Sequence, residues 1–217
     1  MNLKLTDFDA IIFDMDGVLV DSEPFYVEVE QQNFRKLGLN VTHKEHITYQ
    51  GTATDVMWYR VKDKHGLSQS VEELVKMTNS IVTPYFQNLE LIESMPGVSE
   101  LIRFLANKNI PIAVASSSTP EVIEIILNKT GLKKYFSIVV DSQMAGSSKP
   151  EPDIFLLAAK KLGIAPEKCL VIEDSTNGIK AAKQAGMSCV AYAGPGSEFQ
   201  DQNRADWIIK DFSELYV

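Results

Sequence analysis

The sequence predicts an α/β fold, in which helices cover both faces of a doubly wound parallel sheet and a helical domain is inserted after the first strand. Short runs rich in Ile and Val alternate along the chain with segments whose apolar residues repeat at helical spacing. The runs are continuously apolar, which is typical of strands buried on both faces of a parallel sheet. This alternation predicts right-handed crossovers and a Rossmann-like layered core.

Six apolar runs are the predicted strands, at 10–13, 110–115, 137–140, 169–172, 188–193 and 207–209. Four helices are predicted between them, at 98–108, 121–130, 153–162 and 179–185. Thr119 and Pro120 are typical of a helix start, since the side chain of one can cap the first turn and the other needs no N–H there. Gly131, Gly163 and Gly186 stand where glycines commonly end helices.

One long stretch breaks the alternation and predicts a second domain. Amphipathic helices are expected at 23–37, 54–64 and 71–86, with little strand signal between them. We therefore predict a helical cap domain over residues 21–87, and an α/β core domain formed by residues 1–20 and 88–217. Pro96 and Gly97 mark the return of the chain to the core.

The composition excludes several classes of partner. The chain has 217 residues, is 45% hydrophobic and carries a net charge of -8. Nucleic-acid backbones and anionic membrane surfaces repel so acidic a protein, so neither is expected as a partner. Cys169 and Cys189 lie in predicted strands and are expected to be buried thiols. We find no secretory signal or membrane span, and expect a cytoplasmic monomer.

Polar side chains gather where the predicted strands end. Asp14 and Asp16 follow the first strand, Ser116 and Ser117 the second, Lys149 stands in the loop after the third, and Glu173 and Asp174 follow the fourth. In open α/β sheets ligands bind beyond the carboxyl ends of the strands, so these residues are expected to converge at one edge. A lone strand-end Asp or surface Lys would mean little, but their joint occurrence in strand order predicts an active site.

Each residue has a chemical role that fits phosphoryl transfer. Asp14, Asp16 and Asp174 offer the hard oxygens that Mg²⁺ prefers, whereas direct ligation by Glu173 is left open against a supporting role. Asp14 is the predicted nucleophile and Asp16 the general acid and base. Lys149 would neutralise the transferring group. The Ser116 hydroxyl and the backbone N–H groups around Ser117 would hold phosphoryl oxygens near a helix N-terminus, and Ser118 is expected only to lead into that helix.

Four segments resemble the motifs of the haloacid dehalogenase superfamily. These are the run from Asp14-Met15-Asp16-Gly17 to Glu23, Ser116 after its strand, Ser148-Lys149-Pro150, and Glu173-Asp174-Ser175 with Gly178. The nearest branch resembles the β-phosphoglucomutase-like phosphatases. The resemblance implies an aspartyl-phosphate intermediate, Mg²⁺ held by the Asp14 carboxylate, the Asp16 carbonyl and Asp174, and a mobile cap that excludes water.

The chain departs from the mutases of that branch in its cap. Tyr26 stands where they place a His, and Thr54, three residues after Gly51, stands where they place an Arg. Thr cannot replace the bidentate grip of Arg on a second phosphate. We therefore expect a Mg²⁺-dependent phosphatase for a small phosphorylated metabolite, such as a sugar phosphate, with a sugar phosphomutase as the alternative. Gly51 and Thr54 are the predicted substrate-binding residues of the cap, and Arg60, Lys62 or Lys64 stay open as substitutes for the missing Arg.

Other functions fit the pattern less well. A phosphoreceiver module orders its acidic pair, phosphorylated Asp, hydroxyl and Lys differently and has no cap. A dehalogenase needs no metal, so Asp16 and Asp174 argue against it. No Gly-x-Gly-x-x-Gly follows the first strand, which disfavours dinucleotide binding. The three histidines, His43, His46 and His65, form no catalytic arrangement and are expected at the surface.

Overall fold

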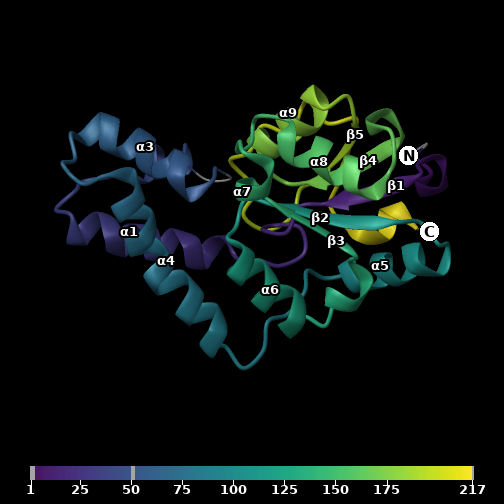
Figure 1. The fold of residues 1–217 in the computed structure, drawn as a ribbon, viewed down its shortest axis with the longest axis horizontal. Coiled ribbons are helices and arrows are strands. Elements are labelled where there is room, and N and C mark those ends of the chain that lie inside the picture. Colours follow the sequence, from purple (N-terminus) through teal and green to yellow (C-terminus); the bar gives the residue numbers. More distant parts are fainter. Residues whose placement is uncertain (1–2, 50–51, 217) are drawn as a thin grey trace.

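The computed structural model describes residues 3–49 and 52–216, and its centre is a six-stranded sheet (Figure 1). The strand order is β3-β2-β1-β4-β5-β6, and every neighbouring pair is parallel. The strands are β1 (Ala10–Phe13), β2 (Ile112–Ser116), β3 (Ile138–Asp141), β4 (Cys169–Glu173), β5 (Ser188–Tyr192) and β6 (Trp207–Ile209). The predicted doubly wound α/β fold is thereby confirmed.

Alternating side chains of β1 explain the three-layer core. Ile11 and Phe13 join one hydrophobic cluster with α5 (Val98–Asn107) and α6 (Pro120–Lys129). Ala10 and Ile12 point to the opposite face and join a second cluster with α8 (Asp153–Leu162) and α9 (Thr176–Gln184). Since successive residues of a strand face opposite sides, a strand that is apolar throughout needs helices on both. Figure 1 shows these two helix pairs on either side of the sheet.

Local chemistry explains where the elements differ from their predicted bounds. Strand β2 begins two residues later than expected because Pro111 has no N–H for the ladder. Helix α9 begins three residues earlier because Ser175 Oγ accepts the N–H of Gly178 and caps it. The sequence analysis missed several short elements: α2 (His43–Ile47), α7 (Ser142–Ala145), and the 3-10 turns Leu5–Asp7, Lys133–Tyr135, Pro166–Lys168 and Phe212–Leu215.

A group of helices stands beyond one end of the sheet, opposite the end at which both termini lie (Figure 1). It comprises α1 (Glu23–Lys36), α2, α3 (Thr54–His65) and α4 (Val71–Asn88). These helices bury a cluster of their own around Trp58, Phe34 and Leu74. The domain division at residues 21 and 87 stays a prediction, although α4 ends within a residue of it. None of the helices in the described residues combines the length and apolarity that crossing a membrane requires.

The chain reverses its direction of travel across the sheet at β1. It runs from β1 through β2 to β3 on one side, and then returns to place β4 on the other side of β1. The carboxyl ends of β1, β2 and β4 therefore diverge into loops around a crevice, which is the usual ligand site of such sheets. Helix α1 follows directly after the loop at the end of β1, so the helical segment overhangs this crevice.

Candidate active site

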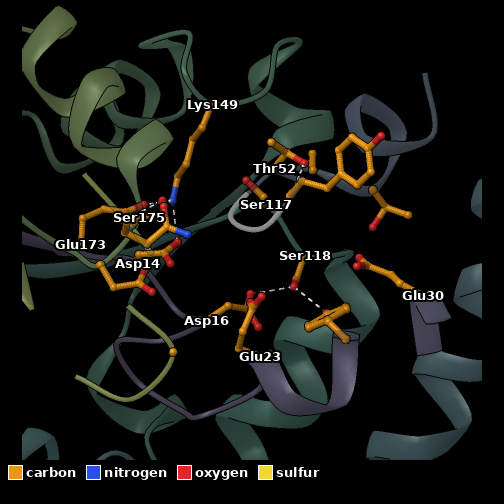
Figure 2. Close-up of a pocket in the computed structure, with 17 residues that line it drawn as sticks. Asp14, Asp16, Glu23, Glu30, Thr52, Ser117, Ser118, Lys149, Glu173 and Ser175 are labelled. Atoms are coloured by element: carbon orange, nitrogen blue, oxygen red, sulfur yellow. Dashed lines mark hydrogen bonds and ion pairs between the residues drawn. The ribbon is translucent and has the colours of Figure 1, made fainter. Parts of the chain in front are cut away.

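A buried lysine joins two carboxylates at the end of the sheet (Figure 2). Lys149 Nζ lies 2.6 Å from Asp14 Oδ1 and 2.7 Å from Glu173 Oε1. Asp14 follows β1 and Glu173 ends β4, two strands that are paired in the sheet. Lys149 is 2% exposed and Glu173 is 0% exposed, so these charges depend on one another rather than on water.

The carboxylates outnumber the cation that faces them. Burial raises the pKa of Asp14 to about 8; Lys149 opposes this, while Glu173 and Asp16 add to it. Burial also raises the pKa of Asp174, together with the charges of Glu173 and Asp14. Burial alone would lower the pKa of Lys149, but the charges of Asp14 and Glu173 outweigh it and the pKa is raised. The site is therefore short of positive charge.

The acidic cluster has the composition of a site for a hard divalent cation. Asp14, Glu173 and Asp174 each present a carboxylate oxygen, and these atoms lie within 4.8 Å of one another. Glu173 is already engaged, because its Oε1 accepts from Lys149 and its Oε2 accepts from both the N–H and the hydroxyl of Ser175. Asp14 and Asp174 thus have more capacity left for a cation, and an all-oxygen donor set suits Mg²⁺. Direct ligation by Glu173 stays a prediction.

The side chain of Asp16 is held by hydroxyl groups, apart from that cluster. Its Oδ1 accepts from Ser22 Oγ at 2.5 Å, and its Oδ2 accepts from Ser118 Oγ at 2.8 Å and Ser116 Oγ at 3.3 Å. The carboxylate therefore faces the loop after β2 and lines the pocket beside Ser118. This leaves the Asp16 carbonyl, and not its carboxylate, for the predicted metal contact.

Ser118 directly precedes the N-cap of α6, as expected of a residue that leads into the helix, and its hydroxyl also lies in the pocket. Its hydroxyl lies between Asp16 and the cap, with Tyr26 Oη 2.9 Å away. Figure 2 shows it in the space between the core and the helical segment. Burial raises the pKa of Tyr26 well above its usual range, with the charge of Asp16 adding to it, so this phenol is a neutral hydrogen-bonding group.

The two predicted phosphoryl-binding serines lie in different surroundings. Ser116 is fully buried, where its Oγ donates to Asp16 and accepts the N–H of Ser118. Ser117 lines the pocket, and its buried Oγ has no hydrogen-bond partner among the described residues. A buried hydroxyl without a partner is uncommon unless a ligand completes it. Ser117 is therefore the better placed of the two to donate to a substrate oxygen.

The helical segment closes the pocket from above. The residues that the helical segment contributes to the pocket lining include Glu23, Tyr26, Glu30, Tyr49, Thr52 and Thr54. The pocket thus includes Thr54 as predicted, whereas Gly51 lies outside the described residues. Sequence reasoning did not single out Glu30 or Tyr49, which follow no motif. His46 is 3% exposed and its Nε2 lies 2.6 Å from Glu30 Oε2, so the expectation that it lies at the surface was wrong.

Gly17 is required by both its backbone and its neighbour. Its φ is +79°, and a Cβ built there would lie 2.2 Å from Asp174 Oδ2. We expect Gly17→Ala to displace Asp174 and to lower the rate of phosphate release by at least about tenfold. The variant should also lose roughly 1–2 kcal/mol in the free energy of unfolding, because a left-handed backbone is unfavourable for a non-glycine residue. Gly163→Ala is the matched control, since its φ is +73° and its Cβ would meet nothing within 4 Å. Equal activity in the two variants would contradict the assignment.

Comparisons with known proteins identify the family of this chain. A family model described as haloacid dehalogenase-like hydrolase matches residues 11–192, and this chain belongs to that family. Within it the chain is a phosphoric monoester hydrolase of the β-phosphoglucomutase-like branch, as the sequence motifs predicted.

Two of the similar proteins are phosphatases that are named for phosphorylated sugars or sugar alcohols. A phosphorylated carbohydrates phosphatase of Thermotoga maritima is 34% identical and matches 82% of this chain and 82% of its own. Hexitol phosphatase B of Escherichia coli is 30% identical and matches 95% of this chain and 93% of its own. The solved β-phosphoglucomutase of Clostridium difficile has a TM-score of 0.82 and 27% identity, covering 96% of this chain and 93% of its own.

Proposed function

We propose that this protein is a Mg²⁺-dependent phosphatase that hydrolyses a small sugar phosphate through an aspartyl phosphate on Asp14. The buried Lys149, which bridges Asp14 and Glu173 beside Asp174, is the observation that carries the proposal. A fixed cation next to a nucleophilic carboxylate is positioned to offset charge on a transferring phosphoryl group. The sugar phosphate is proposed because two relatives are a phosphorylated carbohydrates phosphatase and a hexitol phosphatase.

The reaction proceeds in two steps, phosphorylation of Asp14 and hydrolysis of the aspartyl phosphate. A carboxylate oxygen of Asp14 attacks phosphorus, the bond to the ester oxygen breaks, and Asp16 gives its proton to the leaving alcohol. Asp16 then takes a proton from water, which attacks the same phosphorus and releases orthophosphate, restoring Asp14. Ser117 Oγ donates to a phosphoryl oxygen throughout. Hydroxyl groups hold Asp16 in the lining of the pocket, where its carboxyl group can exchange a proton with the leaving oxygen.

Asp14 and Asp174 would hold the Mg²⁺ ion, with the Asp16 carbonyl and, if it ligates directly, Glu173. When bound, the ion supplies the positive charge that the cluster lacks and neutralises phosphoryl oxygens. Residues 21–87 act as a cap domain, which carries the substrate-facing residues and keeps bulk water away from the acyl phosphate.

Removal of divalent cations tests the metal requirement. We expect EDTA to abolish phosphate release and added Mg²⁺ to restore it. In the described structure a single lysine, Lys149, faces the three carboxylates of Asp14, Glu173 and Asp174, so the site lacks positive charge. Mg²⁺ should also raise the melting temperature of the EDTA-treated protein, since a ligand that binds only the folded state stabilises it. Full phosphate release in EDTA would contradict the proposed Mg²⁺ requirement.

The reaction itself is tested with the purified protein and Mg²⁺ on a panel of sugar and small-metabolite phosphates, with released orthophosphate as the readout. A sugar phosphomutase is the alternative, favoured by the structural likeness to the Clostridium difficile enzyme. It predicts conversion of β-glucose 1-phosphate to glucose 6-phosphate once a bisphosphate primer is added, without net phosphate release. That result would replace the phosphatase proposal.

A further inference from the structure

The cap side of the pocket carries an acidic group. Glu30 projects from α1 toward the space beside Ser118, as Figure 2 shows, and it lines the same pocket as Asp16 and Lys149. The proposed phosphoryl chemistry lies on the core side and does not use it. A carboxylate here therefore faces whatever part of the substrate extends away from the phosphate.

Glu30 is fixed in position by a buried partner. His46, on α2, lies with its Nε2 2.6 Å from Glu30 Oε2, and its ring meets Phe34 edge-on at 5.2 Å. Because His46 is 3% exposed, its packing holds the carboxylate in one place rather than letting it swing into solvent. The contact uses Oε2 and leaves Oε1 to accept from a ligand.

Apart from its contact with His46, Glu30 has no Lys or Arg partner in the described part of the pocket. Among the described residues that line it, Lys149 is the one Lys or Arg, and its Nζ is engaged by Asp14 and Glu173. The cap cations that the sequence left open as phosphate-binding groups point elsewhere. Arg60 Nη1 lies 3.5 Å from the Thr48 carbonyl, Lys62 Nζ donates to two backbone carbonyls, and Lys64 pairs with Glu45.

We propose that Glu30 accepts hydrogen bonds from hydroxyl groups at the non-phosphorylated end of the substrate, and that it excludes substrates with a second anionic group there. This inference rests on the proposed phosphatase activity and narrows its substrate class. An ionised carboxylate only accepts hydrogen bonds, so it favours hydroxyl donors and repels a carboxylate or a second phosphate. The substrate is thus a polyhydroxy monophosphate with an otherwise uncharged chain.

The first test uses the wild-type enzyme and three probes, each of which carries a single phosphate group. Hexitol 6-phosphate has hydroxyls, hexyl phosphate has a chain of the same length without them, and 2-phosphoglycolate has a carboxylate. We expect kcat/KM for hexitol 6-phosphate to exceed each of the others by roughly tenfold or more, since a charge-assisted hydrogen bond is lost or a repulsion gained. Hexyl phosphate or 2-phosphoglycolate used equally well would overturn the inference.

Variants then assign the preference to Glu30. Glu30→Gln is expected to lower the ratio of kcat/KM for hexitol 6-phosphate to that for hexyl phosphate by roughly tenfold, mainly through KM, because Glu30 lies away from the phosphorus. Glu28→Gln is the matched control, since Glu28 is an exposed residue of the same helix, and its ratio should equal the wild type's.

The outcomes distinguish failure of the proposed role of Glu30 from failure of the phosphatase proposal. An unchanged ratio in Glu30→Gln, with hydrolysis retained, overturns the role of Glu30 and leaves the phosphatase proposal standing. Absence of phosphate release from all three probes and from the whole panel of sugar and small-metabolite phosphates overturns both. If Glu30→Gln fails to fold, the wild-type comparison of the three probes decides.

Discussion

Replacement of Asp14 by Asn is expected to lower phosphate release by about 10⁴-fold or more, because an amide cannot form the acyl phosphate. Asn has nearly the same volume and can still accept from Lys149, whose other partner, Glu173, remains in place. The variant should therefore keep its fold while losing its chemistry. The measurement is the rate of orthophosphate release at a saturating concentration of substrate. Mass spectrometry of the intact protein tests for the phosphorylated intermediate.

Asp9→Asn is the matched control, since Asp9 is an exposed residue at the other end of β1. We expect its activity to equal the wild type's. The Asp14 variant should melt at the wild-type temperature or higher, because it removes one of two buried carboxylates that share a single lysine. Substantial activity in Asp14→Asn would show that another group is the nucleophile and would remove the central assignment.

Much of this fold could be predicted because its strands are buried on both faces. Runs such as 169–172 are apolar throughout, so the sequence predicts buried parallel strands and their positions along the chain. Their carboxyl ends bring Asp14, Lys149 and Glu173 to one edge. The short helix α2 escaped prediction because five residues carry too little periodicity to stand out.

The rest of the site depends on which face of each cap helix turns inward. Glu30 and His46 are polar residues in polar stretches, where exposure is the ordinary expectation. Packing of α1 against α2 buries one and aims the other into the pocket, and no local pattern encodes that contact. The role of Gly178 in the core also needs the structure, because a Cβ built on Gly178 would lie 1.5 Å from Glu173 Oε1. Sequence shows the glycine, but only the packed structure shows what it accommodates.

Lys149→Met should have the second large effect, on stability as well as on rate. Methionine fills much of the same space but leaves Asp14 and Glu173 buried without their shared cation. Removing one member of a buried ion pair typically costs about 3–5 kcal/mol in the free energy of unfolding. We also expect phosphate release to fall by roughly 10²–10³-fold, the usual cost of losing one fixed group that stabilises transition-state charge.

Lys183→Met is the control for this prediction, because it removes the same charge from an ion pair that is exposed to solvent. Lys183 pairs with Asp206 at a similar distance, 2.6 Å, but its side chain is 33% exposed. Solvent screens such a pair, so its loss should change the free energy of unfolding by no more than about 1 kcal/mol and leave phosphate release unchanged. Denaturant unfolding and rate measurements on both variants decide the matter. If the two lysine variants lose equal stability, the buried bridge between Asp14 and Glu173 does not organise the site.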